Sequence, residues 1–233
     1  MKTYSPSNSH KSSVVCLLCE KHTEALFDEK RKRAYYYCSS CSLYFKDPKS
    51  YQSFVKQKER YDLHENNQES EGYRNYFQRF LDFLSLSSLE GVDLALDFGC
   101  GRSRLLASMM KEEGVICDSY DPIYAPFEYE KKRYDLIVST EVFEHLHHPK
   151  ESFISLLGAL REGGYLAIQT AFHPQTKEAF FSWYYTEDTT HIVFFSIKSF
   201  EVLALAYGCK VIRTNGKNMI LLQKRGNEEI LCP

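Results

Sequence analysis

Two glutamates and three histidines follow an apolar run typical of a buried strand, in the segment YDLIVSTEVFEHLHHP (residues 134–149). If the chain turns into a helix after this run, Glu141, Glu144 and His145 stand at positions i, i+3 and i+4 and share one helix face. A further histidine, His191, lies between a polar and an apolar run later in the chain. Carboxylates and imidazoles together suit a divalent metal ion. We therefore predict that these four side chains form one site for a divalent ion such as magnesium or manganese.

The same residues also allow chemistry without a metal. A glutamate after such a strand can position or cap the chain, and a nearby histidine can act as a general base or simply pack. The catalytic candidates on this interpretation are Glu141, His145 and His191, with either histidine as the base.

Four cysteines near the start of the chain form two C-x2-C pairs, CLLC and CSSC, separated by eighteen residues. They are Cys16, Cys19, Cys38 and Cys41. Each pair presents two thiolates about one tetrahedral edge apart, so two pairs complete a tetrahedron around zinc. Four sulfur ligands leave no open position, which makes the predicted zinc structural and not catalytic. Iron in a rubredoxin-like site and four buried free thiols are the alternatives.

A glycine-rich turn, LALDFGCGRSRLL, links an apolar strand to a helix. Gly99 and Gly101 let the backbone pass close to a ligand at the carboxyl edge of a parallel sheet. Asp97 ends the strand two residues before the first glycine, and Asp121 closes the next strand, where an acid can bind ribose hydroxyls. The pattern predicts a cofactor site, and a tight strand–helix turn without a ligand is the alternative.

Strands and helices alternate over the second half of the chain, which favours a parallel sheet with helices on both faces. We expect strands at 93–98, 115–120, 135–139 and 165–170, and helices near 103–113, 151–161 and 198–207. The final segment, KVIRTNGKNMILLQK, reads as a hairpin around Asn215-Gly216 with a type I′ turn. The sheet is therefore expected to close with an antiparallel edge.

The composition is that of a folded, weakly charged protein of 233 residues, with 29 Lys+Arg against 31 Asp+Glu. This balance excludes a global basic field for nucleic acid. The polar first residues lack the apolar core of a signal peptide, and no run approaches the roughly 18 apolar residues of a membrane span, so we expect a cytoplasmic protein without a membrane partner. We divide the chain into a flexible tail (1–12), a zinc ribbon (13–48), a helical linker that roofs the cofactor (49–90) and a main domain (91–233).

Four segments together resemble the successive motifs of class I S-adenosylmethionine-dependent methyltransferases: LDFGCGRSRLL, YDPIY, YDLIVSTEVFEHLHHP and LREGGYLAIQT. The resemblance runs from about residue 92 to 224. It implies an α/β, Rossmann-like sheet of seven mostly parallel strands whose last strand is antiparallel. It also implies S-adenosylmethionine as the cofactor, with Asp97, Gly99 and Gly101 around its amino-acid part and Asp121 on its ribose. Some bacterial methyltransferases of this type also carry an N-terminal zinc ribbon.

Cys100, between the two glycines, and Thr140, at the end of the strand before the first glutamate, complete the candidate cofactor contacts. The chain departs from the family pattern twice. Ser103 takes the place of the third glycine of the first motif, which a small residue should tolerate. Tyr134 follows Asp121 by only thirteen positions, too few for the usual helix, third strand and adenine-binding loop.

The E-x-x-E-H set with a distant histidine resembles the small-RNA 2′-O-methyltransferases and the ubiquinone-pathway O-methyltransferases, which implies transfer to a hydroxyl held by a divalent ion. The acceptor is a small molecule or an RNA. Trp183, Tyr184 and Tyr185 form either a lid that stacks on a planar or sugar-like substrate or an apolar cover of the sheet. The alternatives are a C- or N-methyltransferase acting on a sugar or an RNA base, and a non-enzymatic zinc-ribbon module that binds RNA or protein beside a vestigial cofactor pocket.

Overall fold

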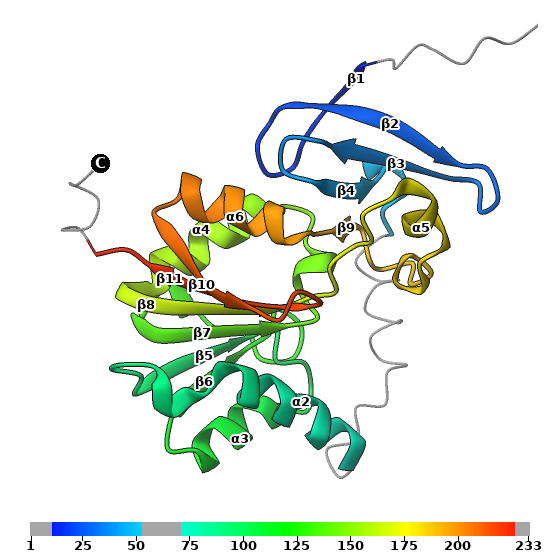
Figure 1. The fold of residues 1–233 in the computed structure, drawn as a ribbon. Helices are drawn as coiled ribbons and strands as arrows, with labels where there is room; N and C mark the ends of the chain where they lie inside the picture. Colours follow the sequence, from blue (N-terminus) through cyan, green and yellow to red (C-terminus); the bar gives the residue numbers. More distant parts are fainter. Residues whose placement is uncertain (1–10, 53–70, 227–233) are drawn as a thin grey trace, which may run out of the picture.

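The computed structural model describes residues 11–52 and 71–226, which form two sheets and the helices that cover them (Figure 1). Residues 1–10 of the expected tail lie outside these ranges, as do residues 53–70 of the segment expected to roof the cofactor. Lys11 already belongs to a strand, β1 (Lys11–Val15), so the N-terminal sheet begins before the expected boundary at residue 13.

The main sheet runs in the order β10-β11-β8-β7-β5-β6. Its strands are β5 (Leu94–Phe98), β6 (Ile116–Tyr120), β7 (Tyr134–Thr140), β8 (Leu160–Gln169), β10 (Cys209–Thr214) and β11 (Met219–Lys224). The pairs from β8 to β6 are parallel, whereas β11 is antiparallel to both β8 and β10. The Rossmann-like α/β architecture is confirmed.

The expectation of seven strands is wrong for the described part of the chain, where the main sheet has six. The strand that is missing lies in the family pattern between β6 and β7. Here that segment contains only a short 3-10 turn, η3 (Tyr129–Lys131). Thirteen positions do not hold a helix, a strand and two loops, so the sheet ends at β6 on this side.

The C-terminal hairpin forms, but it does not place its antiparallel strand at the edge. β11 lies between β8 and β10, and β10 is the edge strand. The four residues Met219–Leu222 are buried, whereas most of β10 is half-buried, so the more apolar strand takes the inner position. The turn is wider than the two-residue type I′ form, because the Asn215 side-chain oxygen accepts the N–H groups of Lys217, Asn218 and Met219.

Helices cover both faces of the main sheet (Figure 1). α2 (Glu71–Leu84) and α3 (Leu105–Glu112) pack on one face, and α4 (Pro149–Ala159) and α6 (Ile197–Ala206) pack on the other. The expected helices are therefore confirmed, with shifts of a few residues at their ends. No helix in the two described ranges is long and apolar enough to cross a membrane.

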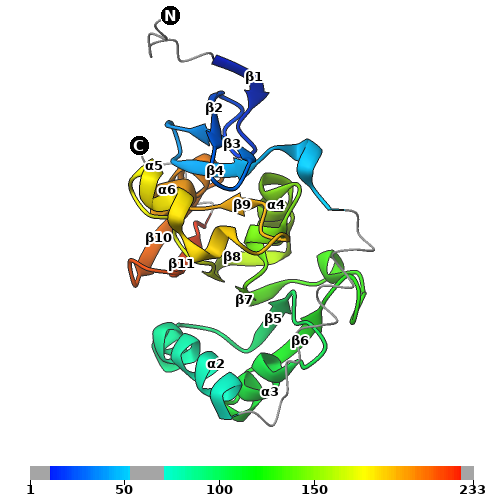
Figure 2. The ribbon, with the colours of Figure 1, turned by 90° about the vertical axis from the view of Figure 1, so that its right-hand side faces the viewer.

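The cysteine-bearing segment forms a second sheet of four strands plus one from the main domain. β1, β2 (His22–Asp28), β3 (Arg33–Cys38) and β4 (Leu43–Lys46) are antiparallel neighbours, and β9 (Val193–Phe194) adds to the edge of β4. Figure 2 shows this sheet above the main domain, with β9 beneath β4. Buried ribbon residues such as Leu43 and Phe45 belong to the same apolar cluster as Phe200 of α6. The ribbon and the main domain therefore share one core.

Candidate active site

The loop between β5 and α3 is shaped by its two glycines. Gly99 has a φ of +82°, and a Cβ added there would lie 2.2 Å from Cγ2 of Val142, so only glycine fits. Gly101 has a φ of +61°, and a Cβ there would meet nothing within 4 Å. The N–H groups of Gly99 and Cys100 both donate to the carbonyl of Tyr120 at the end of β6. These two hydrogen bonds fix the loop to the end of β6, and the side of the loop at Gly101 faces open space.

The two predicted acids of this loop lie where the sequence places them. Asp97 is 2% exposed, and burial together with the charge of Asp121 raises its pKa to about 7. Asp121 accepts the N–H of Gly101 on Oδ2 at 3.2 Å and those of Ile123 and Tyr124 on Oδ1 at 2.8 and 3.0 Å. Its carboxylate is therefore fixed beside the glycine loop, and this chemistry fits a ligand that carries vicinal hydroxyls.

The first turns of helix α2 reach the carboxyl edge of the sheet and contribute two tyrosines, whose rings stack 6.5 Å apart. Tyr73 lies near Ser103 and Asp97, and burial raises its pKa. Tyr76 donates to Oε1 of Glu141 at 2.8 Å and accepts from Nε2 of Gln169 at 2.6 Å. Both tyrosines fall in the helical segment (49–90) expected to roof the cofactor, but the sequence did not single out either one or connect Tyr76 with Glu141.

The two glutamates after β7 come together through Tyr185 and not through a helix. The helix considered for this segment does not form: Glu141 has a φ of +54°, and only a 3-10 turn follows, η4 (Phe143–His145). The Tyr185 hydroxyl lies 2.9 Å from Oε2 of Glu141 and 2.6 Å from Oε1 of Glu144. One hydroxyl proton satisfies one carboxylate, so a further proton or a cation must belong to this group. Burial, followed by the charge of Glu144, raises the pKa of Glu141 to about 7.

The two predicted histidines face each other, with ring centroids 4.8 Å apart. Nδ1 of His145 lies 3.0 Å from the carbonyl of Thr190, and Nδ1 of His191 lies 2.9 Å from the carbonyl of Tyr185. A carbonyl only accepts, so each Nδ1 carries a proton and each neutral ring has its lone pair on Nε2. Burial is the main cause, and the neighbouring His145 the second, that lower the pKa of His191 to about 4. The ring of His191 is therefore neutral.

Ligand-type atoms of Glu144, His145 and His191 lie within 4.8 Å of one another. That is slightly wider than the roughly 4.2 Å that two 2.1 Å bonds span across an ion. Glu144 is fully buried, and its Oε2 has no hydrogen-bond partner in the described part of the chain. Histidines fixed through Nδ1 and a buried carboxylate oxygen without a partner fit a divalent ion. Glu141 is outside this three-residue cluster and reaches it through Tyr185.

The three aromatic residues at positions 183–185, ahead of His191, have different surroundings. Tyr185 is buried at the centre of the site, with its ring 4.1 Å from that of His191. Trp183 packs against Tyr185 and against Phe194 of β9. Tyr184 is 74% exposed. Thr140 ends β7 and is half-buried at the same edge of the sheet.

The ribbon holds the segment that carries Tyr185 and His191. Backbone carbonyls of residues 186–192 accept the N–H of Lys46 at 2.9 Å, the Nζ of Lys46 at 2.8 Å and Nη1 of Arg33 at 2.7 Å. The ribbon therefore fixes the backbone that orients one of the two site histidines.

The four cysteines lie together at one end of the ribbon. Sγ of Cys16 is 3.4 Å from that of Cys41, and Sγ of Cys19 is 3.5 Å from that of Cys38. Zn–S bonds of about 2.3 Å give a tetrahedral edge of roughly 3.8 Å, so the spacing suits one ion. The N–H of Leu18 points at Sγ of Cys16, which orients the first turn around it. The four thiols fit a structural tetrathiolate metal.

A match to the family model of the methyltransferase domain covers residues 67–214, so the chain belongs to that family. It is an S-adenosylmethionine-dependent methyltransferase. The alternative of a non-enzymatic zinc-ribbon module is therefore wrong, and the prediction of a methyltransferase is confirmed. No curated protein sequence matches the chain.

Among solved structures, the chain is similar to the Burkholderia thailandensis 1,6-didemethyltoxoflavin N1-methyltransferase bound to S-adenosylhomocysteine, with 13% identity and a TM-score of 0.54 over 87% of this chain and 100% of that one. It is also similar to the Synechocystis magnesium protoporphyrin IX methyltransferase, with 12% identity and a TM-score of 0.48 over 74% of this chain and 88% of that one. The Bacillus subtilis YcgJ protein matches with 12% identity and a TM-score of 0.46 over 64% of this chain and 100% of that one. At such identity, the first of these supports the fold alone.

Proposed function

We propose that this methyltransferase transfers a methyl group to an oxygen acceptor with the help of a divalent ion held by Glu144, His145 and His191. The observation that carries the proposal is the fixed tautomer of the two histidines, whose Nδ1–H groups both donate to backbone carbonyls. That arrangement is the one metal-bound histidines need, because it leaves Nε2 as the ligand atom. The buried oxygen of Glu144 supplies a negative charge beside them.

The residues of the β5–α3 loop bind the cofactor in this proposal. Asp121 accepts the ribose hydroxyls, and Asp97, Gly99, Cys100 and Gly101 surround the amino-acid part. Thr140, at the end of β7, borders the reacting methyl group. S-adenosylmethionine supplies a methyl group on a positively charged sulfonium.

Transfer breaks the methyl–sulfur bond and forms a methyl–oxygen bond, and the acceptor hydroxyl loses its proton. A divalent ion lowers the pKa of a hydroxyl that it binds. Glu141, held by Tyr76 and Tyr185, takes the proton, and His145 and His191 would hold the ion through Nε2. Orientation of donor and acceptor along one line contributes most of the rate.

The cysteine cluster holds a structural zinc in this account and takes no part in the reaction. Its role is to keep the ribbon folded, and through the ribbon to keep Tyr185 and His191 in place. Trp183 supports Tyr185, and Tyr184 is the exposed aromatic that an acceptor meets first.

Replacing Asp121 by alanine is expected to weaken S-adenosylmethionine binding by roughly 1–3 kcal/mol, about 5- to 150-fold in Kd, because buried ribose hydroxyls lose their partner. Isothermal calorimetry measures this directly. Asp118→Ala, on β6 three positions before Asp121, is the matched control and should bind with unchanged affinity. Equal affinity for wild type and a folded Asp121→Ala variant would remove Asp121 from the cofactor site.

Chelation is expected to stop methyl transfer, and manganese, cobalt or magnesium to restore it. The assay follows tritium from methyl-labelled S-adenosylmethionine into a metabolite or RNA extract. The chelator must be mild enough to leave the cysteine-bound metal in place, which elemental analysis and circular dichroism verify. Full activity after removal of every metal except that of the ribbon would contradict assistance by a divalent ion. A histidine would then act as a simple general base.

A further inference from the structure

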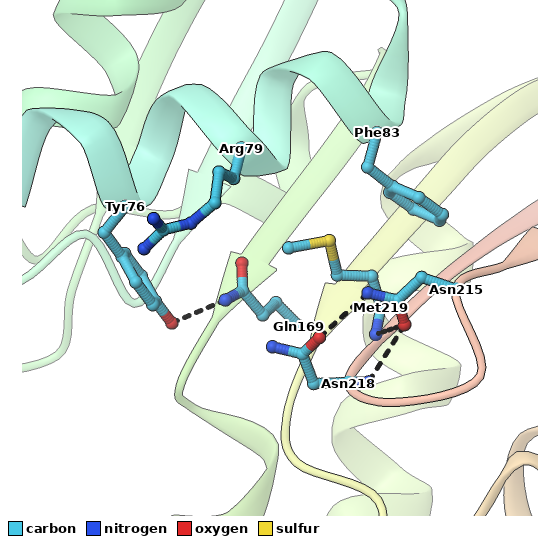
Figure 3. Close-up of a pocket in the computed structure, with 7 residues that line it drawn as sticks. All are labelled: Tyr76, Arg79, Phe83, Gln169, Asn215, Asn218 and Met219. Atoms are coloured by element: carbon cyan, nitrogen blue, oxygen red, sulfur yellow. Dashed lines mark hydrogen bonds between the residues drawn. The ribbon is translucent and has the colours of Figure 1, made fainter.

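A pocket of about 410 Å³ opens next to the proposed acceptor site, between α2 and the tip of the C-terminal hairpin. Tyr76 and Gln169, which line the pocket, hydrogen-bond each other (Figure 3). The volume is within the range of small-molecule sites. Since Tyr76 also donates to Glu141, a molecule in this pocket lies one side chain away from the proposed reaction centre.

Two polar groups in the pocket lack partners among the residues that the structure describes. Gln169 is 1% exposed, and its Oε1 has no hydrogen bond in the described part of the chain. Figure 3 shows this oxygen pointing into the space beneath Arg79. Asn218 accepts from Asn215 on Oδ1 at 2.9 Å, so its amide nitrogen remains a donor. A buried acceptor without a partner is destabilising unless a ligand supplies a donor.

Arg79 gives the pocket its charge. It makes no ion pair with a carboxylate within residues 11–52 and 71–226, and no other charged side chain lines the pocket. The remaining walls are apolar: the rings of Tyr76 and Phe83 and the side chain of Met219. One guanidinium without an ion-pair partner in the described ranges, flat aromatic walls and no second cation among the lining residues favour a planar monoanion over a phosphate, which attracts several positive groups.

We propose that this pocket binds the carboxylate-bearing, planar part of the methyl acceptor. Arg79 holds the carboxylate, Asn218 adds a donor, and Gln169 accepts a hydroxyl or amino hydrogen of the same molecule. The acceptor class is therefore a small aromatic carboxylate with at least one hydrogen-bond donor. The assignment of the pocket to the acceptor rests on the proposed function, but binding in the pocket does not require methyl transfer.

The test measures binding of benzoate and benzamide by ligand-observed NMR, with S-adenosylhomocysteine present. Benzoate should bind at least tenfold more tightly than benzamide. Arg79→Gln should remove that preference, because it takes away the charge but keeps a polar side chain on an exposed helix face. Arg133→Gln, an exposed arginine just before β7, is the matched control and should change nothing.

The proposal is overturned if benzoate binds Arg79→Gln as tightly as wild type, or if benzamide binds wild type as well as benzoate does. Inorganic phosphate that displaces benzoate at equal concentration would also overturn it, in favour of a phosphorylated ligand. Calorimetry of S-adenosylhomocysteine on the same samples separates the two proposals. A protein that fails to bind S-adenosylhomocysteine contradicts the proposed function, whereas loss of benzoate discrimination alone contradicts only the pocket assignment.

Discussion

Replacing Glu144 by glutamine is expected to lower the rate of methyl transfer by about 10³-fold while leaving the affinity for S-adenosylhomocysteine unchanged. Glu144 is fully buried and supplies the only carboxylate of the three-residue cluster in the described part of the chain. The amide keeps the shape of the side chain and its contact with Tyr185 but loses the negative charge. The Glu144 side chain is directed at Tyr185, whereas the cofactor loop lies between β5 and α3.

The same loss is expected for His145→Ala and His191→Ala, since three ligands that hold one ion act as a unit. Glu151→Gln makes the same chemical change on the exposed face of α4 and is the control. Rates are measured by transfer of labelled methyl, and affinities by calorimetry. Three variants that differ from each other by more than about tenfold, or a Glu144→Gln enzyme with wild-type turnover, would show that these residues do not share an ion.

Replacing Cys38 by serine is expected to destabilise the whole protein and not the ribbon alone. A metal bound by four thiolates contributes on the order of 10 kcal/mol to folding in zinc-finger peptides, and a site with three thiolates loses much of it. Cys38 belongs to the same apolar cluster as Phe200, and β9 of the main domain pairs with the ribbon strand β4. Loss of the metal should therefore lower Tm in a single transition and also release the segment around His191.

Calorimetric unfolding and zinc content are measured on Cys38→Ser and on Cys117→Ser, a half-buried cysteine of β6 outside the cluster. The control should keep its metal and nearly all of its stability. Two separate transitions in Cys38→Ser, with the upper one at the wild-type Tm, would show that the ribbon unfolds independently of the main domain. Purified wild-type protein without zinc, or with iron in its place, would contradict the assignment of zinc to the four cysteines.

Features that depend on short spacings along the chain could be predicted from the sequence. The two C-x2-C pairs, the two glycines around Cys100 and the acid at position 121 all meet through local turns or through the regular order of parallel strands. The thirteen-position gap before Tyr134 also contained the information that one strand is missing. The family resemblance nevertheless favoured seven strands. The main sheet of the described residues has six, because the gap is too short for the seventh.

Features that depend on contacts between distant segments were not readable. Tyr76 and Glu141 are 65 positions apart, and Gln169 and Tyr76 are 93 apart, so no spacing rule connects them. The same holds for β9, two residues whose pairing with the ribbon strand β4 is set by packing of the two sheets. The helix considered at Glu141 does not form, because that residue has a left-handed backbone conformation and a 3-10 turn follows it. Glu144 and His145 reach His191 nonetheless, since Ile192 donates to the carbonyl of Glu144.

Binding of manganese to the zinc-loaded protein, followed by electron paramagnetic resonance, tests the central claim most directly because it needs neither the acceptor nor turnover. The free-ion signal should fall with a stoichiometry of one manganese per chain, and Glu144→Gln and His191→Ala should abolish this binding while Glu151→Gln retains it. A wild-type protein that binds no manganese, cobalt or magnesium yet transfers methyl groups at full rate would contradict the metal-assisted mechanism.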